Sequence, residues 1–517
     1  MYIELDRLLM RTNFVRCIAL VLFLFFAATL PANAEIQTIT STGEYTMGEG
    51  ETMPVAKERA LAEAVKSAAQ QAGVYVESYS RTSNLVLTQD EVNILSFGMV
   101  EVLDKHYDEP KYSGKTCYLR VTITARVDTG NIEESRRILQ SKSLAVDLKR
   151  MQAAYEDCQQ DIMRLKAQLA QAAGNEKKDI VQRIADNEKR YRVASLIRQG
   201  YNSAVQKNYE ASIQAFTQAI DLDPQYAFAY TNRGNTYHEW KQLDLALADY
   251  NKAIALDPTD DSAYYNRGLL YSSLNRYDLE MADYGKAITI NPNNVYALNN
   301  RGIAYANAKQ YDLALADYNK AITVDPNNAY AYDNRGNAYF ELRQYQQALA
   351  DYDESIRLDP SNKSAYQNRG QVKSVFKQYE PAIAEFNQAI LLGANTTHIY
   401  RVRGMAYHQL MQYQAAITDY DKAIELDPNN AINYFYRGVS KYGLKQFEAA
   451  IADCDKAIEL KPGQLGGGAY FYKGVSLTYL QRPQEAIDAL RLYIRYSDEA
   501  NRIEMAKNII RRLGGTP

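Results

Sequence analysis

The stretch AFAYTNRGNTYHEWKQLDLALADYNKAIALDPTD, residues 227–260, decides the fold, because similar stretches follow one another along most of the chain. One glycine of this stretch recurs every 34 residues, at positions 200, 234, 268, 302, 336, 370, 404 and 438. A fixed period of this length is typical of a solenoid, in which each small unit buries its apolar face on the next. The sequence therefore predicts a long repeat array, which offers a surface for binding rather than an obvious place for chemistry.

Each unit has the pattern of two helices. Apolar residues recur three and four positions apart in both halves of residues 227–260. Asp257 and Pro258 then close the unit, since proline disfavours helix in the residue before it. Aligned on the glycines, the units start at 193, 227, 261, 295, 329, 363, 397 and 431, and a ninth starts at 467 after a two-residue insertion.

These units resemble the tetratricopeptide repeat. The second unit has the family's aromatic, small and proline residues at the family's offsets: Tyr230, Gly234, Tyr237, Ala246, Tyr250, Ala253 and Pro258. The resemblance covers residues 193–500 and implies a mainly α fold, a right-handed superhelical solenoid of nine repeats, with residues 501–517 as a capping helix and tail. Single copies depart from the pattern: Glu280 stands where the small alanine belongs, and Lys373 and Lys441 replace the first-helix tyrosine.

The recurring glycine and alanines predict close helix crossing. A larger side chain at these positions would hold the two helices of a unit apart, whereas small residues let ridges enter grooves. The aromatic residues would then fill the space that remains between the helices and between units.

An asparagine stands two residues before the glycine in five consecutive units: Asn232, Asn266, Asn300, Asn334 and Asn368. The family resemblance implies that this part of the first helix faces the concave groove. A side-chain amide offers one acceptor and two donors, which match a peptide unit, so the ladder is a candidate peptide-binding site. The alternative is that asparagine merely tolerates a solvated groove or bonds a neighbouring carbonyl.

An arginine precedes the glycine in seven units, and an acid follows it sixteen residues later. The pairs are Arg233 with Asp249, Arg267 with Asp283, Arg301 with Asp317, Arg335 with Asp351, Arg369 with Glu385, Arg403 with Asp419, and Arg437 with Asp453. Both partners are missing together from the first unit, which has Gln199 and Ala215. We interpret them as structural ion pairs between the two helices of a unit. The less favoured alternative is an anion-binding role for the arginines.

The first 34 residues have the pattern of a signal peptide. A basic start is followed by the apolar run 17–30 and by the small-x-small site Ala32-Asn33-Ala34, which predicts cleavage after Ala34 and an exported, periplasmic protein. An uncleaved anchor is the alternative. No later segment is apolar enough to be a transmembrane segment of the mature chain. The net charge of −3 gives no basic excess, so nucleic acid is not expected as a partner.

Residues 35–130 predict a small α+β domain. Strands are expected at 36–40, 74–79, 99–108 and 116–128, with an amphipathic helix over 55–71. The stretch GEYTMGEGETMPVAKERALAEAVKSAAQQAGVYVES resembles the N-terminal domain of flagellar assembly protein T and related envelope lipoproteins. That resemblance implies an envelope-associated structural module without catalysis.

Residues 131–192 predict a coiled-coil or helical linker. Apolar residues alternate spacings of four and three at Leu144, Leu148, Met151, Tyr155, Cys158, Ile162, Leu165, Leu169 and Ala172. This stripe favours a homo-oligomer through residues 144–172. The alternative is a hairpin within one chain that turns at Gly174. In a parallel dimer Cys158 would face its own copy and be able to form a disulfide in an exported compartment; otherwise it is a small buried residue.

The sequence contains no familiar catalytic or metal-binding motif. His106, His238, His398 and His408 fall at unrelated positions, without His-Glu-x-x-His or Cys-x-x-Cys. A nucleophile elbow and a phosphate-binding glycine loop are also missing from the sequence. We therefore predict that the protein is not an enzyme and binds no cofactor or metal.

Two functional hypotheses follow from these patterns. The first is an exported scaffold or adaptor that mediates protein–protein interaction in the cell envelope and binds a peptide or helix of another envelope protein in its concave groove. The alternative is an envelope assembly or secretion factor, related to flagella or polysaccharide, that uses the array as a spacer or carbohydrate-binding surface. Groove tyrosines would then matter more than the asparagines. An enzyme site within residues 35–130 is a third and weaker hypothesis.

Overall fold

The computed structural model describes residues 36–47, 53–82, 100–113, 116–128, 157, 160–169, 171–462 and 467–517. The predicted signal peptide, residues 1–34, lies outside them. The chain divides into two compact units, Met1–Pro292 and Asn293–Pro517, and each is described by itself.

A four-stranded antiparallel sheet opens the first unit. It consists of β1 (Ile36–Met47), β2 (Val100–Tyr107), β3 (Lys111–Ser113) and β4 (Thr116–Asp128). The long β4 lies between β1 and β2, and β3 pairs with the beginning of β4. Thr42 is opposite Thr122 in the β1–β4 register, and the β2–β4 register shifts between Val102 and Asp104. The strands expected at 36–40, 99–108 and 116–128 are thus present, whereas β3 was not predicted.

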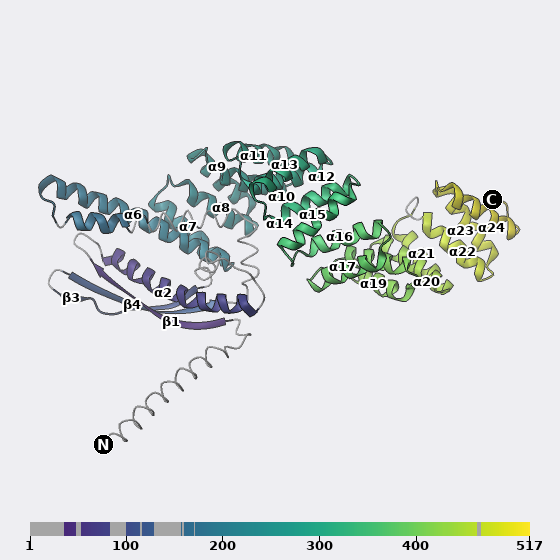
Figure 1. Cartoon of the computed structure of the whole chain (residues 1–517), viewed down its shortest axis with the longest axis horizontal. Coiled ribbons are helices and arrows are strands. Elements are labelled where there is room, and N and C mark those ends of the chain that lie inside the picture. Colours follow the sequence, from purple (N-terminus) through teal and green to yellow (C-terminus); the bar gives the residue numbers. More distant parts are fainter. Residues whose placement is uncertain are drawn as a thin grey trace, which may run out of the picture. The chain divides into compact units, whose positions relative to one another are not determined.

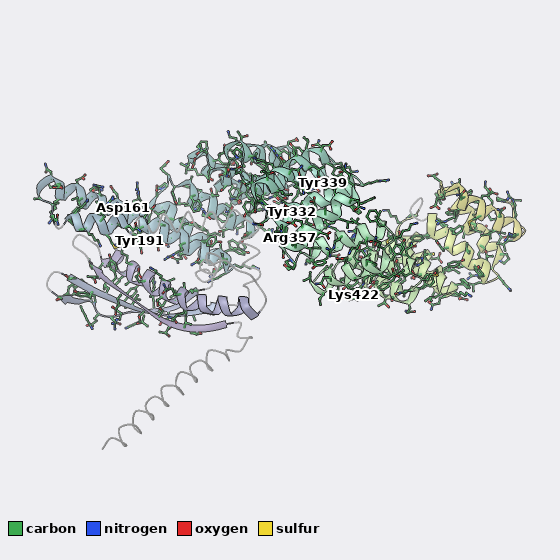
Figure 2. All side chains as sticks on the ribbon, in the orientation of Figure 1. Asp161, Tyr191, Tyr332, Tyr339, Arg357 and Lys422 are labelled. Atoms are coloured by element: carbon green, nitrogen blue, oxygen red, sulfur yellow. The ribbon has the colours of Figure 1, made fainter. Side chains whose placement is uncertain are left out.

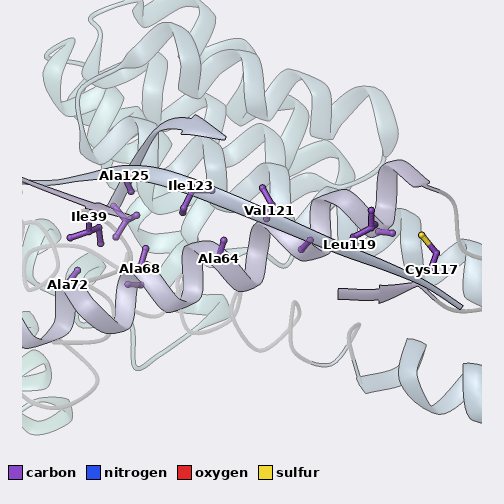
Figure 3. Packing of buried hydrophobic residues seen from close by; sticks show 13 residues of the cluster. Ile39, Ala64, Ala68, Ala72, Cys117, Leu119, Val121, Ile123 and Ala125 are labelled. Carbon is purple, nitrogen blue, oxygen red and sulfur yellow. The ribbon is translucent and has the colours of Figure 1, made fainter. Parts of the chain in front are cut away.

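Helix α2 (Met53–Thr82) covers one face of this sheet (Figure 1). Its fully buried alanines are spaced by four, at Ala56, Ala60, Ala64, Ala68 and Ala72, and they pack against alternate residues of β4, as Figure 3 shows. The helix approaches β1 so closely that a Cβ on Gly43 would lie 2.0 Å from the carbonyl oxygen of Ala60. Small side chains therefore set the distance between helix and sheet.

The strand predicted at 74–79 is wrong, because α2 continues through this segment to Thr82. The prediction ended the helix before Gly73 and assigned the following β-branched residues to a strand. A glycine inside a helix costs only about 1 kcal/mol relative to alanine. Each residue added to an existing helix gains a backbone hydrogen bond without a new nucleation step, so one glycine need not end it.

A helical hairpin follows the sheet domain in the first unit. Residues 160–169 are helical and turn back at residues 171–173 into α6 (Gly174–Val205). Leu165 and Leu169 of the first arm pack on Ile180 and Ile184 of the second. The predicted seam for a homo-oligomer is therefore covered within the chain at these two positions, because the turn at Gly174 has a positive φ that lets the chain reverse. The seam positions from Leu144 to Cys158 lie outside the described residues.

Cationic and aromatic side chains join the hairpin to the sheet domain. Arg59 of α2 donates from Nη1 to the hydroxyl of Tyr45 at 2.5 Å, and its guanidinium lies 5.1 Å from the ring centre of Tyr191 of α6, labelled in Figure 2. Lys166 of the first hairpin arm also donates to the Tyr45 hydroxyl, at 3.1 Å. Arg59 and Lys166 thus connect α2, β1 and the hairpin.

Helix pairs fill the rest of the first unit. They are α6 (Gly174–Val205) with α7 (Tyr209–Leu222), α8 (Ala227–Glu239) with α9 (Leu243–Leu256), and α10 (Asp261–Ser273) with α11 (Tyr277–Ile290). The predicted boundary at residue 193 between linker and first repeat falls inside α6. No glycine or proline interrupts residues 175–199, so linker and first repeat form one continuous helix.

The second unit contains the remaining pairs and a final helix. They are α12 (Val295–Asn307) with α13 (Tyr311–Val324), α14 (Ala329–Glu341) with α15 (Tyr345–Leu358), α16 (Lys363–Val375) with α17 (Tyr379–Leu391), α18 (Thr397–Gln409) with α19 (Tyr413–Leu426), α20 (Ala431–Gly443) with α21 (Phe447–Leu460), α22 (Gly467–Tyr479) with α23 (Pro483–Tyr496), and then α24 (Ala500–Arg512). Ile510 of α24 packs on Phe471 and Leu490 of the last pair, as expected of a capping helix. None of the described helices is both long and apolar enough to cross a membrane.

The recurring glycine makes room for an aromatic ring of the second helix. A Cβ on Gly336 would lie 2.7 Å from Cε1 of Tyr352, which is buried in the same repeat. The same clash with a ring would occur in the preceding and following copies, as at Gly234 with Tyr250 and Gly370 with Phe386. The predicted packing role of the glycine is confirmed, and the tyrosines that lie against it are core residues of the repeats.

The turn between the two helices of each repeat has a left-handed residue that is not glycine. These residues are Lys207, Lys241, Asn275, Lys309, Arg343, Lys377, Met411, Lys445 and Gln481, with φ between 55° and 65°. In the fourth repeat the amides of Lys309 and Gln310 donate back to the carbonyls of Ala306 and Tyr305 at 2.9 and 2.8 Å. This is the Schellman arrangement that ends a helix and satisfies its last carbonyls.

Candidate functional site

Each arginine of the repeat pattern lies against the acid sixteen residues later. In the fifth repeat, Nε of Arg335 donates to Asp351 Oδ2 at 2.8 Å and Nη2 donates to Oδ1 at 2.6 Å. The other six pairs, Arg233–Asp249, Arg267–Asp283, Arg301–Asp317, Arg369–Glu385, Arg403–Asp419 and Arg437–Asp453, are separated by 2.6 to 2.8 Å. The hydrogen bonds that Arg335 donates to Asp351 hold the pKa of Arg335 above its ordinary value.

The same arginine also reaches the repeat before it. Arg335 Nη1 donates to Asn319 Oδ1 of α13 at 2.7 Å. Its guanidinium lies 5.4 and 5.9 Å from the ring centres of Tyr332 and Tyr339, both labelled in Figure 2. With an ion pair, a second acceptor and aromatic rings around it, this guanidinium is fully engaged. The contacts of Arg335 therefore favour the structural interpretation of this arginine over an anion-binding role.

Two departures from the repeat pattern extend this arrangement. Lys373 and Lys441 replace the second tyrosine, and each forms a further ion pair with the acid of its own repeat, Glu385 at 2.5 Å and Asp453 at 2.8 Å. The third departure, Glu280, is buried at an alanine position and is hydrogen-bonded to Ser272; burial raises its pKa. At Lys373 and Lys441, the lost tyrosine ring is thus replaced by an additional ion pair with the acid of the same repeat.

The predicted asparagine ladder has different contacts in its different members. In the second repeat, Asn232 is buried and donates to the carbonyl of Phe228 one turn earlier, at 2.8 Å. Asn266 is also buried, and within the described residues its amide nitrogen has no hydrogen-bond partner. The structure therefore gives Asn232 the carbonyl-bonding role that the sequence left as an alternative.

From the fourth to the sixth repeat, the ladder links the first helices of successive repeats. Asn300 is half-buried. Asn334 of α14 donates to Asn299 Oδ1 of α12 at 3.0 Å. Asn368 of α16 donates to Asn337 Oδ1 of α14 at 2.8 Å and to Asp333 Oδ1 at 3.4 Å. These amides are therefore held in fixed orientations by neighbouring repeats.

A polar pocket opens where this network is densest. Its volume is about 200 Å³, and Asn337, Phe340 and Glu341 of α14, Tyr352 of α15, and Asn368 and Gln371 of α16 line it. The Tyr352 hydroxyl donates to Asn337 Oδ1 at 2.8 Å, and Gln371 Nε2 donates to Asn368 Oδ1 at 3.3 Å. Amide groups of two successive repeats thus converge on one cavity, which we call the amide pocket.

Asp333 of α14 does not line this pocket but accepts a hydrogen bond from its lining residue Asn368, and sequence patterns alone did not single it out. Its side chain is only 6% exposed, and burial raises its pKa to about 6. Its position in the repeat holds Thr231, Tyr265 and Asn299 in the preceding copies. A comparison of the aligned copies would have shown an acid at this position, where the three preceding copies have neutral residues.

The last three repeats have no asparagine at the ladder position, and two of them have tyrosine there. At the ladder position the chain has Val402, Tyr436 and Tyr472. Tyr472 contacts Tyr442 edge-on at 5.5 Å, and Phe447 stacks on Tyr479 with ring centres 4.7 Å apart. Tyr479 is 62% exposed. The rings of Tyr442, Tyr472, Tyr479 and Phe447 therefore form a second candidate surface, the aromatic row.

Two of the four histidines lie in the seventh repeat, and both have protein partners. His408 Nδ1 is 2.9 Å from Ser440 Oγ, and His398 Nδ1 is 3.0 Å from Arg401 Nη2. Burial lowers the pKa of both imidazoles. Across the described ranges no group of three or more histidine, cysteine, aspartate or glutamate residues is arranged to hold a metal ion.

Family models match the chain repeat by repeat. The model described as "Tetratricopeptide repeat" matches residues 227–260, 295–328, 329–362 and 399–430; a second model with that description matches 261–294 and 433–464, and one described as "TPR repeat" matches 205–240. The chain is a tetratricopeptide repeat protein. Several matched ranges begin at the starts predicted from the glycine alignment, at 227, 261, 295 and 329. The tetratricopeptide repeats make the protein a scaffold for protein–protein interaction.

Solved structures that resemble this tetratricopeptide repeat protein cover only part of it. YrrB, titled a TPR protein with an unusual peptide-binding site, is 25% identical over 37% of this chain and 97% of its own, with a TM-score of 0.34. PilF of Pseudomonas aeruginosa is 20% identical over 39% and 92%, and PilW, titled a type IV pilus biogenesis factor, is 20% identical over 39% and 94%; both have TM-scores of 0.37. No curated protein matches the chain.

Proposed function

We propose that this protein is an exported, periplasmic adaptor whose repeat groove binds an extended peptide of another envelope protein. The observation that supports this most directly is the amide pocket, where Asn337 and Asn368 of successive repeats meet. A side-chain amide has the same donors and acceptor as a peptide unit, so it can bind a backbone without selecting its side chains. We assign no reaction to the chain.

The pocket amides are prepared for binding before a ligand arrives. Asn368 donates to both Asn337 and Asp333, and Tyr352 also donates to Asn337. Groups that are already oriented lose less side-chain entropy when a ligand binds. A rigid row of polar groups on successive helices is therefore suited to an extended chain that runs along the groove.

Export is the second part of the proposal. It rests on the basic start, the apolar run and the small-residue site at the N-terminus, with cleavage after Ala34. Mass spectrometry of protein recovered from the periplasmic fraction should find Glu35 as the first residue. Full-length protein that stays in the membrane fraction would indicate an uncleaved anchor instead.

Self-association is proposed only for the part of the stripe that precedes the hairpin. Residues 144–158 keep the heptad spacing, whereas Leu165 and Leu169 are covered by α6. Light scattering on the full chain and on a variant with Leu144 and Leu148 changed to Ser tests this. A dimer of the full chain that the variant lacks is the expected result, and a monomer in both proteins would remove this part of the proposal.

The adaptor function is tested by capture from an envelope fraction. The full chain is compared with the double variant Asn337→Ala/Asn368→Ala and with Asn429→Ala, a control at an exposed turn between repeats. The pocket variant should lose its captured protein, while the control keeps it. Circular dichroism must show equal helix content in the three proteins, because the asparagines also join neighbouring repeats.

Equal capture by all three proteins would reject the amide pocket as a binding site. The earlier ladder hypothesis predicts the same loss for Asn266→Ala/Asn300→Ala/Asn334→Ala. That variant is less discriminating, since Asn334 already donates to Asn299 and its loss also removes a link between repeats.

A second candidate function is an envelope assembly or secretion factor that binds carbohydrate. The aromatic row favours it, since Tyr479 is exposed and rests on Phe447 at 4.7 Å. Flat rings with a polar hydroxyl suit ligands that have both apolar and polar faces. Retention of envelope polysaccharide by the full chain, and its loss in Tyr479→Ala with protein capture unchanged, would favour this second function.

A further inference from the structure

The amide pocket has an excess of hydrogen-bond acceptors. Three donors of the lining are used within it, and the amide nitrogen of Asn337 stays available: the Tyr352 hydroxyl and one amide proton of Asn368 go to Asn337, and one amide proton of Gln371 goes to Asn368. Glu341 at the rim has only acceptor atoms when ionised and forms no ion pair or hydrogen bond with the described residues. A ligand group that enters here therefore meets mainly oxygen atoms.

Negative charge accompanies these acceptors. Asp333 is 6% exposed, and its one hydrogen bond is the long contact from Asn368 at 3.4 Å to Oδ1. Within the described residues its second oxygen has no hydrogen-bond partner. A buried carboxylate without a counter-charge is unfavourable, and a nearby cation would relieve it.

Among the described residues, no cationic side chain lines this pocket. The lining contains Asn337, Phe340, Glu341, Tyr352, Asn368 and Gln371, none of which carries positive charge. The arginines on both sides, Arg335 and Arg369, are engaged with acids of the second helices, Asp351 and Glu385. Positive charge would therefore have to come from a ligand.

The shape of the pocket fits a side chain. Its volume of about 200 Å³ takes one long residue and excludes a folded element. Phe340 provides an apolar wall over which methylene groups can pack, and an aromatic face also attracts a cation. Asn337 keeps a free amide nitrogen among the described contacts, and that nitrogen can donate to a backbone carbonyl of the same ligand.

We propose that the amide pocket binds the cationic end of a lysine or arginine side chain of the bound peptide, beside Glu341 of the lining and within the field of Asp333, which is hydrogen-bonded to the lining residue Asn368. This inference rests on the proposed peptide-binding function and adds its specificity. Peptides with an acid at the same place are repelled by the two carboxylates, so the pocket selects as well as attracts.

A positional peptide library tests the inference. N-acetylated, C-amidated nine-residue peptides, each fixed at one position and mixed at the others, are bound to the full chain. At one fixed position lysine or arginine should exceed norleucine and glutamine by about tenfold or more, as expected for hydrogen bonds to charged groups. Asp333→Asn/Glu341→Gln should reduce that preference to within about twofold while other positions stay the same.

Glu354→Gln is the matched control. Glu354 is an exposed acid of α15 that pairs with Arg357, so its loss changes net charge but not the pocket. If it removes the basic preference as well, general electrostatics and not the pocket is responsible. Peptides bound by the full chain without a basic preference would overturn this inference and leave the adaptor function intact. Binding of no peptide at all would overturn both.

Discussion

Arg335 and Asp351 form a bidentate ion pair, at 2.8 and 2.6 Å, that joins the two helices of the fifth repeat. The same guanidinium reaches Asn319 of the fourth repeat at 2.7 Å. One side chain thus stabilises both the fold of its own repeat and the interface with the preceding repeat. Corresponding arginines form the same ion pair with the acid of the second helix in seven repeats.

Removal of the acid should destabilise the array strongly. Asp351 is about 7% exposed, so Asp351→Ala leaves the Arg335 charge half-buried without its main partner. We expect a loss of about 3 kcal/mol in the free energy of unfolding. Urea denaturation followed by circular dichroism, fitted with a nearest-neighbour repeat model, measures this. Arg357→Ala, in an exposed ion pair with Glu354, is the control and should cost no more than about 0.5 kcal/mol. Equal effects of the two changes would contradict a buried role for Asp351.

The glycine of each repeat should be irreplaceable only where a ring lies against it. In Gly336→Ala the new Cβ would lie 2.7 Å from Tyr352 Cε1, whereas in Gly438→Ala it would lie 3.4 Å from Cys454 Sγ, because cysteine replaces the ring there. Overpacking costs about 1–3 kcal/mol, against a helix-propensity gain of about 1 kcal/mol.

We therefore expect Gly336→Ala to lower the free energy of unfolding by at least about 1 kcal/mol more than Gly438→Ala does. Thermal and urea unfolding of the two single variants provide the measurement. In a Tyr352→Cys background, Gly336→Ala should cost less than it does in the unmodified protein. If Gly438→Ala is the more damaging change, the aromatic ring is not the reason for the glycine.

The stability of the second unit should depend on the protonation of Asp333. Burial raises its pKa to about 6, from 3.8. A raised carboxyl pKa means that the folded state binds more protons than the unfolded state between these values, so this group stabilises the fold as pH falls from 7 to 4. Asp333→Asn removes the penalty and should be more stable than the unmodified protein at pH 7 by about 1–3 kcal/mol.

The difference between the two proteins should shrink toward zero near pH 4. The other ionisable groups are the same in both proteins, so their contributions largely cancel in the comparison. Urea unfolding at several pH values gives the difference directly. A constant difference from pH 4 to 7 would show that the Asp333 carboxyl does not titrate in this window.

Cys454 should be inert in the folded protein. It is fully buried against Gly438, and burial raises the pKa of its thiol to about 12. The thiolate is the reactive form, so alkylation by iodoacetamide at pH 8 should be negligible without unfolding and rapid in urea. Peptide mapping by mass spectrometry identifies the modified residue. Similar labelling rates in both conditions would mean that the last repeats open readily.

Much of the fold was predictable because the same spacing of glycine, apolar and charged residues recurs in each repeat. The period of Gly234, Gly268 and Gly302 located the helix pairs, and the joint absence of arginine and acid from the first unit indicated which residues are partners. The helix α2 was predicted too short, since a single glycine was given too much weight against the gain from each added hydrogen bond. The left-handed turn residues, such as Lys309, gave no signal, because lysine does not favour that conformation.

The candidate site was only partly predictable. The asparagine ladder directed attention to Asn368, but not to the pocket beside it, because the six lining residues come from three helices. Asp333 was overlooked, since its burial depends on the neighbouring repeat and not on its own helix. The hairpin was one of two alternatives, and the choice between them required the contact of Leu165 with Ile184.

The sequence by itself determined the repeat class, the helix pairs and the arginine–acid partners of this protein, because each depends on spacing within or between copies of one local pattern. Only the tertiary structure decided which asparagines are free for a ligand, where acceptors outnumber donors and which acid is buried. Those properties depend on side chains brought together from successive repeats, and a hydrogen bond such as that from Asn368 to Asn337 has no counterpart in local sequence.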